Sequence, residues 1–240
     1  MPFGAAQFDI YRNPPRINRD EFCHRHDIDP AQPILLYAGS SKGADEFGHL
    51  RMIEDAIDAC RLPPMSVIYR PHPWGRGGFK GERIADHPWR HVRIEESMRG
   101  YIEAVREGRK GISLPDYAET HDVLSSIDAL VSPLSTIILE ALLHGKPALC
   151  FLPASQAGSS LDLQASLVHF EDMYDDPEVL IARGDDALIP SIDDLMRRVG
   201  EPAIGERLAT SSRHFVTDFD AAYGERLTTF FNELVQGGRS

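Results

Sequence analysis

The segment from residue 122 to residue 151 constrains the fold more than any other part of the chain. Its hydrophobic pattern predicts a short helix and then a buried strand at Ala129–Val131, a polar turn, a helix at Ile137–His144 and a second buried strand at Ala148–Phe151. Gly145 is suited to end the helix, because glycine adopts left-handed backbone conformations easily. A strand, a helix and a second strand in this order predict a βαβ unit, which belongs to a parallel sheet.

Earlier apolar runs extend this sheet. Pro33–Ala38 and Met65–Tyr69 are continuous apolar stretches of the kind found in strands covered on both faces, and His91–Ile94 is a shorter third candidate. A helix at Glu46–Ala59 is expected between the first two, because its apolar residues recur on one face. Alternating strands and helices predict the α/β class, with a doubly wound, Rossmann-like parallel sheet.

The remaining segments carry weaker patterns. Short strands are expected at residues 111–114 and around His169–Phe170. We expect residues 1–32 to form a connecting segment and residues 33–240 to form one domain, because neither a repeat nor a low-complexity linker divides the chain. Further helices are expected at Arg19–His26, Met98–Glu107, Asp176–Ala182, Ile192–Val199 and Asp218–Val235.

Charge and length exclude some classes of partner. The 240 residues carry a formal net charge of −12, which argues against nucleic-acid binding through a basic face. The sequence contains no apolar run of about 18 residues, so we expect no transmembrane segment and leave peripheral association with a membrane open.

The cysteines point to a reducing compartment. Cys23, Cys60 and Cys150 are odd in number and far apart, so they offer neither a CxxC pair nor a disulfide framework. A cytoplasmic location is the simplest interpretation. The Cys23–His26 cluster lacks a second group of ligands elsewhere in the sequence, and we therefore predict no metal site.

Polar loops follow three of the predicted strands, at Gly39–Gly43, Arg70–Gly75 and Ser132–Thr136. Because the carboxyl ends of parallel strands meet at one edge of a sheet, we expect these loops to converge. The third loop opens a helix, whose free N–H groups and positive end suit a phosphate. The sequence therefore predicts a site for a nucleotide-activated donor, formed by Gly39, Ser40, Ser41, Arg70, Ser132, Ser135, Thr136, Glu140 and His121.

His72 is the predicted catalytic residue. It lies between two prolines, which restrict its backbone, and an imidazole can serve as donor or acid to a leaving phosphate at neutral pH. A structural histidine in a rigid turn is the alternative. Arg70 could pair with a diphosphate or with a surface carboxylate, and Ser135 and Thr136 could simply cap a helix.

Glu140 and His121 complete the predicted site. Glu140 lies on an apolar helix, where a carboxylate needs a partner such as the hydroxyls of a ribose. His121 and Asp122 precede the short helix before Ala129, where Asp122 could simply be an N-cap and His121 could face the nucleobase. The cleft loops contain no pair of aspartates for a metal, so we predict a metal-independent reaction without a cofactor, in which the nucleotide-activated donor is a substrate.

The pair His72-Pro73, followed by Ser135-Thr136, resembles the HP and S-S/T motifs of bacterial sialyltransferases, Kdo transferases and CDP-glycerol glycerophosphotransferases. The order of the loops resembles the C-terminal, donor-binding domain of GT-B glycosyltransferases over roughly residues 7–151. This resemblance implies a CMP-, CDP- or UDP-linked donor and a role in the synthesis of capsule or other surface polysaccharides.

In enzymes of that architecture a second domain carries the acceptor site. Gln7–Tyr11 resembles the segment that leads into the donor domain, so we expect a donor-binding half, either a fragment or a naturally short protein. Its acceptor site would come from a missing domain or from a partner chain. Two alternatives stay open. The chain could be a non-catalytic nucleotide-binding subunit completed by a partner, or an enzyme similar to UDP-GlcNAc 2-epimerases.

Overall fold

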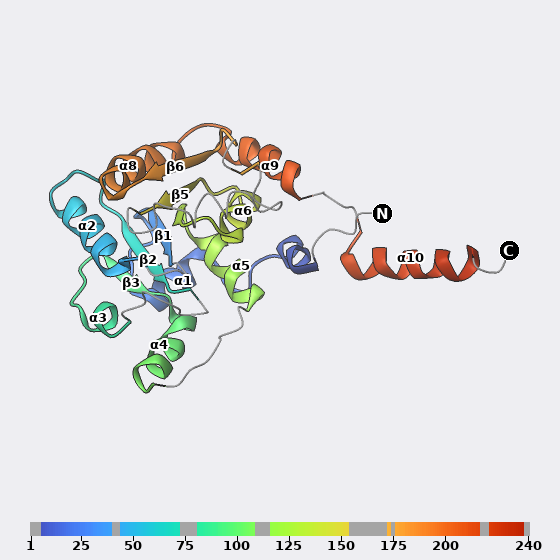
Figure 1. Cartoon of the computed structure of the whole chain (residues 1–240), viewed down its shortest axis with the longest axis horizontal. Helices are drawn as coiled ribbons and strands as arrows, with labels where there is room; N and C mark the ends of the chain where they lie inside the picture. The colour runs from blue at the N-terminus through green and yellow to red at the C-terminus, as the bar shows by residue number, and fades with distance from the viewer. Residues whose placement is uncertain are drawn as a thin grey trace.

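A six-stranded parallel sheet forms the centre of the described chain (Figure 1). The computed structural model describes residues 6–39, 44–72, 81–108, 116–153, 172–173, 176–216 and 221–237. The strand order is β3-β2-β1-β4-β5-β6, which confirms the prediction of a doubly wound α/β sheet. The strands are β1 Ile34–Ala38, β2 Ser66–Arg70, β3 Val92–Ile94, β4 Ala129–Ser132, β5 Ala148–Leu152 and β6 Val179–Arg183.

The strand order reverses between β1 and β4. These strands pair in register, with Leu36 opposite Leu130, although more than ninety residues separate them in sequence. From this pair the chain adds strands outward in both directions, β2 and β3 on one side and β5 and β6 on the other. In open parallel sheets a crevice forms at the carboxyl ends of the strands where the order reverses, and ligands bind there.

Helices cover both faces of the sheet. Adjacent residues of a strand point to opposite faces, so Leu35 packs with Leu50 and Ile192 on one face, while Leu36 packs with Phe22 and Leu142 on the other. This burial from both sides explains the continuous apolar runs of the central strands. The helices are α1 Arg19–His26, α2 Glu46–Asp58, α3 Gly81–Asp86, α4 Arg99–Arg106, α5 Tyr117–Ser126, α6 Thr136–Leu143, α8 Leu188–Val199, α9 Ile204–Phe215 and α10 Tyr223–Gly237.

One predicted helix is wrong. Where a helix was expected at Asp176–Ala182, the structure has β6, which pairs with β5 from Val179 opposite Ala148 to Arg183 opposite Leu152. The apolar run of β6 is too short for its period to separate a strand from a helix. Helix α9 was not predicted, and the strands expected at residues 111–114 and 169–170 lie outside the described residues.

The N-terminal segment packs on the domain where it is described. Phe22 and Cys23 of α1 are buried in the core. Arg19 donates hydrogen bonds to both carboxylate oxygens of Asp128, at 2.8 and 3.1 Å, and to the carbonyl oxygen of Ser126. The short 3-10 helix η1, Ala6–Arg12, lies against α5. The segment expected to act only as a connection thus contributes to the core.

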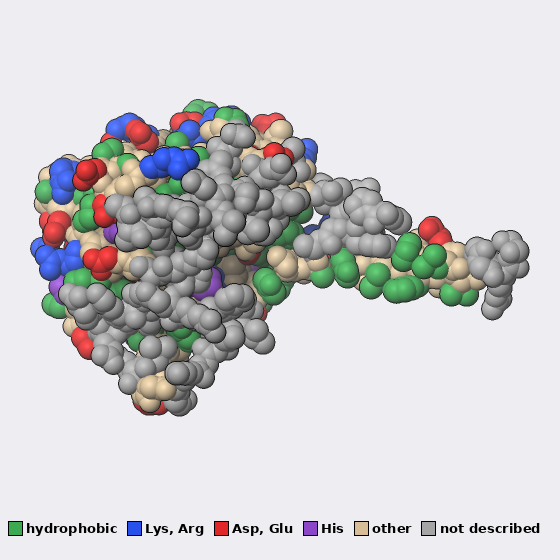
Figure 2. All heavy atoms as spheres, viewed as in Figure 1, with side chains coloured by type: hydrophobic (Ala, Val, Ile, Leu, Met, Phe, Trp, Pro, Cys, Tyr) green, Lys and Arg blue, Asp and Glu red, His purple; other side chains and the backbone are tan. Residues whose placement is uncertain are grey.

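Helix α10 has a different environment. It extends away from the rest of the domain in Figure 1, beyond η1, where the backbone N–H of Tyr223 donates a hydrogen bond to the carboxylate of Asp9. Phe231, Leu234 and Val235 are 55%, 55% and 60% exposed, and Figure 2 shows apolar side chains along this helix. None of the described helices, including α10, is both long enough and apolar enough to cross a membrane.

Candidate functional site

A cavity of about 290 Å³ opens at the carboxyl ends of β1, β2 and β4, where the strand order reverses. The structure brings seven of the predicted site residues to its wall, and Ser40 and Ser41 lie outside the described residues. The described wall consists of Gln7, Ala38, Gly39, Arg70, Pro71, His72, Tyr117, Thr120, Ser132, Ser135, Thr136, Ile137 and Glu140.

The start of α6 presents unused hydroxyl groups to this cavity. Ser135 is the N-cap residue, with extended backbone angles, but its side chain makes no capping hydrogen bond. Ser132, the last residue of β4, is 1% exposed, and its hydroxyl has no hydrogen-bond partner among the described residues. A buried hydroxyl without a partner is costly, so both groups are available to a polar ligand next to the positive end of the helix.

Arg70 supplies positive charge from the end of β2. The side chain is 6% exposed, and its Nη2 donates a hydrogen bond of 2.9 Å to the hydroxyl of Thr120. Its Nε lies 4.0 Å from a carboxylate oxygen of Glu95. Arg70 is therefore fixed in the wall of the cavity, and the structure does not support the alternative of a surface ion-pair residue.

Glu140 projects from α6 into the same cavity and is 6% exposed. The hydroxyl of Tyr11 in η1 donates a hydrogen bond to its carboxylate. Burial raises the pKa of Glu140, while the hydrogen bond from Tyr11 and the charge of Arg70 act in the opposite direction. Sequence reasoning missed this role of Tyr11, since no local pattern links residues so far apart.

His72 lies at the rim of the cavity, directly after Pro71. It is half-buried, and this burial lowers the pKa of its imidazole. The ring is therefore neutral at neutral pH, with one N–H to donate and one nitrogen to accept a hydrogen bond. Its predicted catalytic role remains a proposal.

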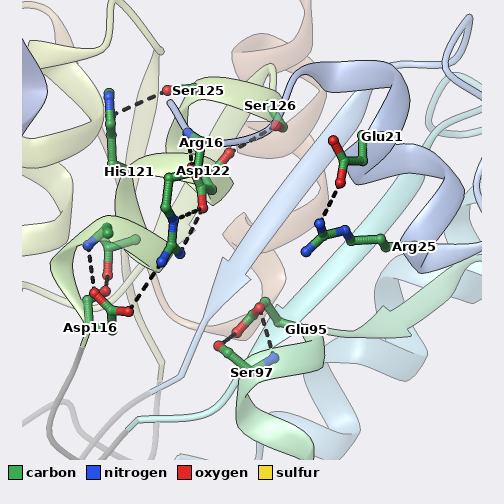
Figure 3. Close-up of polar contacts among 12 residues, drawn as sticks. Arg16, Glu21, Arg25, Glu95, Ser97, Asp116, His121, Asp122, Ser125 and Ser126 are labelled. Carbon is green, nitrogen blue, oxygen red and sulfur yellow. Dashed lines mark hydrogen bonds and ion pairs between the residues drawn. The ribbon is translucent and has the colours of Figure 1, made fainter. Parts of the chain in front are cut away.

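His121 is not among the described residues that line the cavity. Helix α5 begins at Tyr117 and is capped by Asp116, so the prediction that Asp122 caps it is wrong. Asp122 lies in the second turn instead and accepts hydrogen bonds of 2.7 and 2.8 Å from the backbone N–H and Nε of Arg16 (Figure 3). His121 is turned toward the N-terminal segment, where its Nε2 lies 2.8 Å from the carbonyl oxygen of Asn13.

Gly39 is required where β1 reaches the cavity. A Cβ at this position would lie 2.8 and 2.9 Å from the carboxylate oxygens of Glu46. Glu46 is 2% exposed and accepts a hydrogen bond from the hydroxyl of Tyr69, so it has little freedom to move away. Among the described residues, histidine, cysteine and carboxylate side chains do not form a group of three that could hold a metal ion.

Comparison with known proteins tests the fold. Neither a family model nor a curated protein matches the sequence. The structure is similar to a putative UDP-N-acetylglucosamine 2-epimerase from Listeria monocytogenes, with a TM-score of 0.59 and 10% identity, over 98% of this chain and 53% of that chain. A variant of the wall teichoic acid polymerase TagF gives a TM-score of 0.54 and 12% identity, over 99% of this chain and 53% of that chain.

The fold resembles one half of GT-B enzymes. The chain spans about half the length of the solved proteins that it matches. A structure of TagF soaked with CDPG is also similar, with a TM-score of 0.50 and 12% identity, over 99% of this chain and 50% of that chain. At these identities the GT-B likeness concerns the arrangement of strands and helices.

Proposed function

We propose that the chain is the donor-binding half of a metal-independent GT-B glycosyltransferase or glycerophosphotransferase that serves the synthesis of bacterial surface polysaccharides. The observation that carries the proposal is the buried, unpartnered hydroxyl of Ser132 beside the non-capping side chain of Ser135, both at the start of α6. Hydroxyl and N–H donors at a helix N-terminus are suited to the oxygens of a phosphate. The resemblance of His72-Pro73 and Ser135-Thr136 to the HP and S-S/T motifs implies that the donor is a CMP-, CDP- or UDP-linked compound.

Each side chain has a role in this proposal. Ser132, Ser135 and the N–H groups of α6 hold the phosphate that leaves with the nucleotide, and Arg70 offsets its charge. His72 donates a hydrogen bond or a proton to the same leaving group. Glu140 accepts hydrogen bonds from the ribose hydroxyls, and these replace the water that the carboxylate lost on burial. The acceptor hydroxyl and its base come from the other half of the enzyme.

Two other functions are compatible with the same fold. A nucleotide-binding subunit without activity of its own is supported by the hydroxyls of Ser132 and Ser135 at the start of α6, which suit phosphate binding without requiring a reaction. An epimerase-like function is supported by the similarity to the putative UDP-N-acetylglucosamine 2-epimerase. If the chain is a binding subunit, transferase activity should appear only after a partner chain is added. If it is similar to an epimerase, it should bind UDP-GlcNAc more tightly than the other nucleotides.

Calorimetry with CMP, CDP, UDP and GDP tests the proposed site. We expect one of the pyrimidine nucleotides to bind, and the variant Ser132→Ala to bind it about tenfold more weakly, since one hydrogen bond to a charged group is worth about 1.5 kcal/mol or more. His24→Gln, an exposed change on α1, is the matched control and should bind as the native chain does. The absence of binding by all four nucleotides at millimolar concentration would overturn the proposal.

A further inference from the structure

Two histidine rings meet beneath the wall of the cavity. His121 of α5 and His144, the residue after α6, face one another with Nδ1 of His121 2.8 Å from Nε2 of His144. Both outer nitrogens face backbone carbonyl oxygens. Nε2 of His121 lies 2.8 Å from the oxygen of Asn13, and Nδ1 of His144 lies 2.6 Å from the oxygen of Glu140.

Counting protons shows that this arrangement cannot consist of two neutral rings. A carbonyl oxygen only accepts hydrogen bonds, so each outer nitrogen carries a hydrogen. A neutral imidazole has one N–H, which would leave two bare lone pairs facing each other across the inner contact of 2.8 Å. A third proton between the inner nitrogens converts this repulsion into a hydrogen bond.

We infer that His121 and His144 form an imidazole pair that holds three ring protons and one positive charge, and that this pair positions η1 against the proposed nucleotide site. The third proton belongs to one of the two rings. Burial lowers the pKa of His144 to about 4, so His144 is the neutral ring. His121 is then the imidazolium, whose Nδ1–H donates to Nε2 of His144.

The pair is connected to the cavity through Tyr11. The centre of its ring lies 4.5 Å from that of His144 and 5.3 Å from that of His121, and its hydroxyl donates to the carboxylate of Glu140. Asn13, which accepts from His121, follows directly after η1. The imidazole pair and Tyr11 thus fix η1 to α6 at the residue that would hold the ribose, so the positioning role rests on the proposed function.

The neighbouring carboxylates already have partners. Glu140 accepts a hydrogen bond from Tyr11, and Asp122, next to His121, is paired with Arg16. Lys146 contributes to the low pKa of His144. From α9, the backbone of Gly205 approaches next to this site, at Gly145, and brings no charge.

Ser125 offers an alternative partner when the third proton is lost. Its hydroxyl lies 3.3 Å from Nδ1 of His121 (Figure 3) and can donate to that nitrogen once it is bare. The contact with His144 is then lost, and η1 loses one of its attachments to α6. The pair therefore attaches η1 to α6 only while the third proton is present.

Nitrogen-15 NMR of the histidine rings in the nucleotide-free chain tests the proton count directly. At about pH 6, near the ordinary pKa of histidine, we expect both nitrogens of His121 to carry hydrogen and His144 to be the Nδ1–H tautomer. A neutral Nε2–H tautomer of His121 at that pH, or an Nε2–H form of His144, would overturn the inference.

Two substitutions separate positioning from simple structural support. His121→Gln keeps an N–H donor toward His144 but has no titratable proton, whereas His121→Ala has neither. We expect the affinity of the native chain for CDP to fall about tenfold between about pH 6 and pH 8.5, that of the glutamine variant to stay nearly constant, and that of the alanine variant to be low throughout.

The controls keep the two proposals apart. His24→Gln should retain the pH dependence of the native chain, because the side chain is exposed. An unchanged pH profile in His121→Gln would contradict the positioning role. If CDP and the other nucleotides fail to bind while the ring protons follow the expected pattern, the proposed function fails and the proton count of the pair stands.

Discussion

The hydroxyl of Tyr11 donates a hydrogen bond to the carboxylate of Glu140, across 129 residues of sequence. Tyr11 belongs to η1, near the N-terminus, and Glu140 belongs to the helix that opens at the predicted phosphate site. The contact places part of the N-terminal segment at the edge of the cavity, where Gln7 also contributes to the wall. An N-terminal segment expected to act as a connection is therefore part of the candidate site.

Replacing Tyr11 with phenylalanine should destabilise the chain in a pH-dependent way. The variant removes a donor from a buried carboxylate, which costs about 1–3 kcal/mol. The hydrogen bond from Tyr11 lowers the pKa of Glu140, so without it that pKa rises further and the loss is larger at about pH 8 than at about pH 5. Urea unfolding at both pH values measures the difference. Tyr223→Phe is the control, because the Tyr223 hydroxyl has no hydrogen bond among the described residues; equal losses in both variants would contradict the expectation.

Glu140→Gln should leave the fold intact and weaken nucleotide binding. Burial raises the pKa of Glu140, so the ionised carboxylate is less favourable in the folded chain than in the unfolded chain. The free energy of unfolding therefore decreases as the pH rises and Glu140 ionises. The amide keeps an oxygen to accept from Tyr11, so the free energy of unfolding at neutral pH should stay equal or rise by about 1 kcal/mol. Affinity for the nucleotide should fall roughly tenfold. A strongly destabilised variant would show that the carboxylate has a structural role instead.

Ser132→Ala should cost no stability. The hydroxyl of Ser132 is buried without a partner, so its removal should leave the free energy of unfolding unchanged or raise it by about 1 kcal/mol. Ser126→Ala is a matched control, since Ser126 is equally buried but donates a hydrogen bond of 2.8 Å to the carbonyl oxygen of Asp122. That variant should lose about 1 kcal/mol. Chemical unfolding of both variants compares them, and a loss in Ser132→Ala equal to that of the control would show that Ser132 has a partner in solution.

Gly39→Ala should destabilise the chain by about 1–3 kcal/mol, because the added methyl group meets the buried carboxylate of Glu46. The carboxylate can move only by giving up the hydrogen bond from Tyr69. Gly205→Ala, in helix α9, meets no atom within 4 Å and should stabilise the chain, since alanine favours a helix by about 0.5–1 kcal/mol over glycine. Thermal unfolding should therefore move in opposite directions for the two variants. A shift of the same sign would contradict this account.

The sequence allowed the sheet to be predicted because its central strands are buried on both faces. Short, continuous apolar runs such as Pro33–Ala38 and Ala148–Phe151 are typical of strands that are buried on both faces of a parallel sheet. The edge strand β6 was misassigned because Leu180 and Ile181 are only half-buried and the preceding Asp-Pro-Glu is suited to the start of a helix.

The candidate site was predictable where its residues follow a strand directly. Arg70 and Ser132 end β2 and β4, so the topology alone places them at the same edge of the sheet. Tyr11 and the imidazole pair escaped prediction, because they depend on how η1 packs on α5 and α6, and hydrophobic periodicity carries no information about that packing. The boundary of α5 was misplaced because Asp116 and Asp122 are both suitable N-cap residues.

The three apolar side chains exposed near the end of α10 affect how the purified chain behaves. Phe231, Leu234 and Val235 form an exposed hydrophobic surface on a helix that points away from the domain. An exposed hydrophobic surface of this kind retains a protein on a phenyl column and promotes aggregation at the concentrations needed for crystals or NMR. A version shortened after Phe215 should therefore elute earlier and tolerate higher concentration than the full chain.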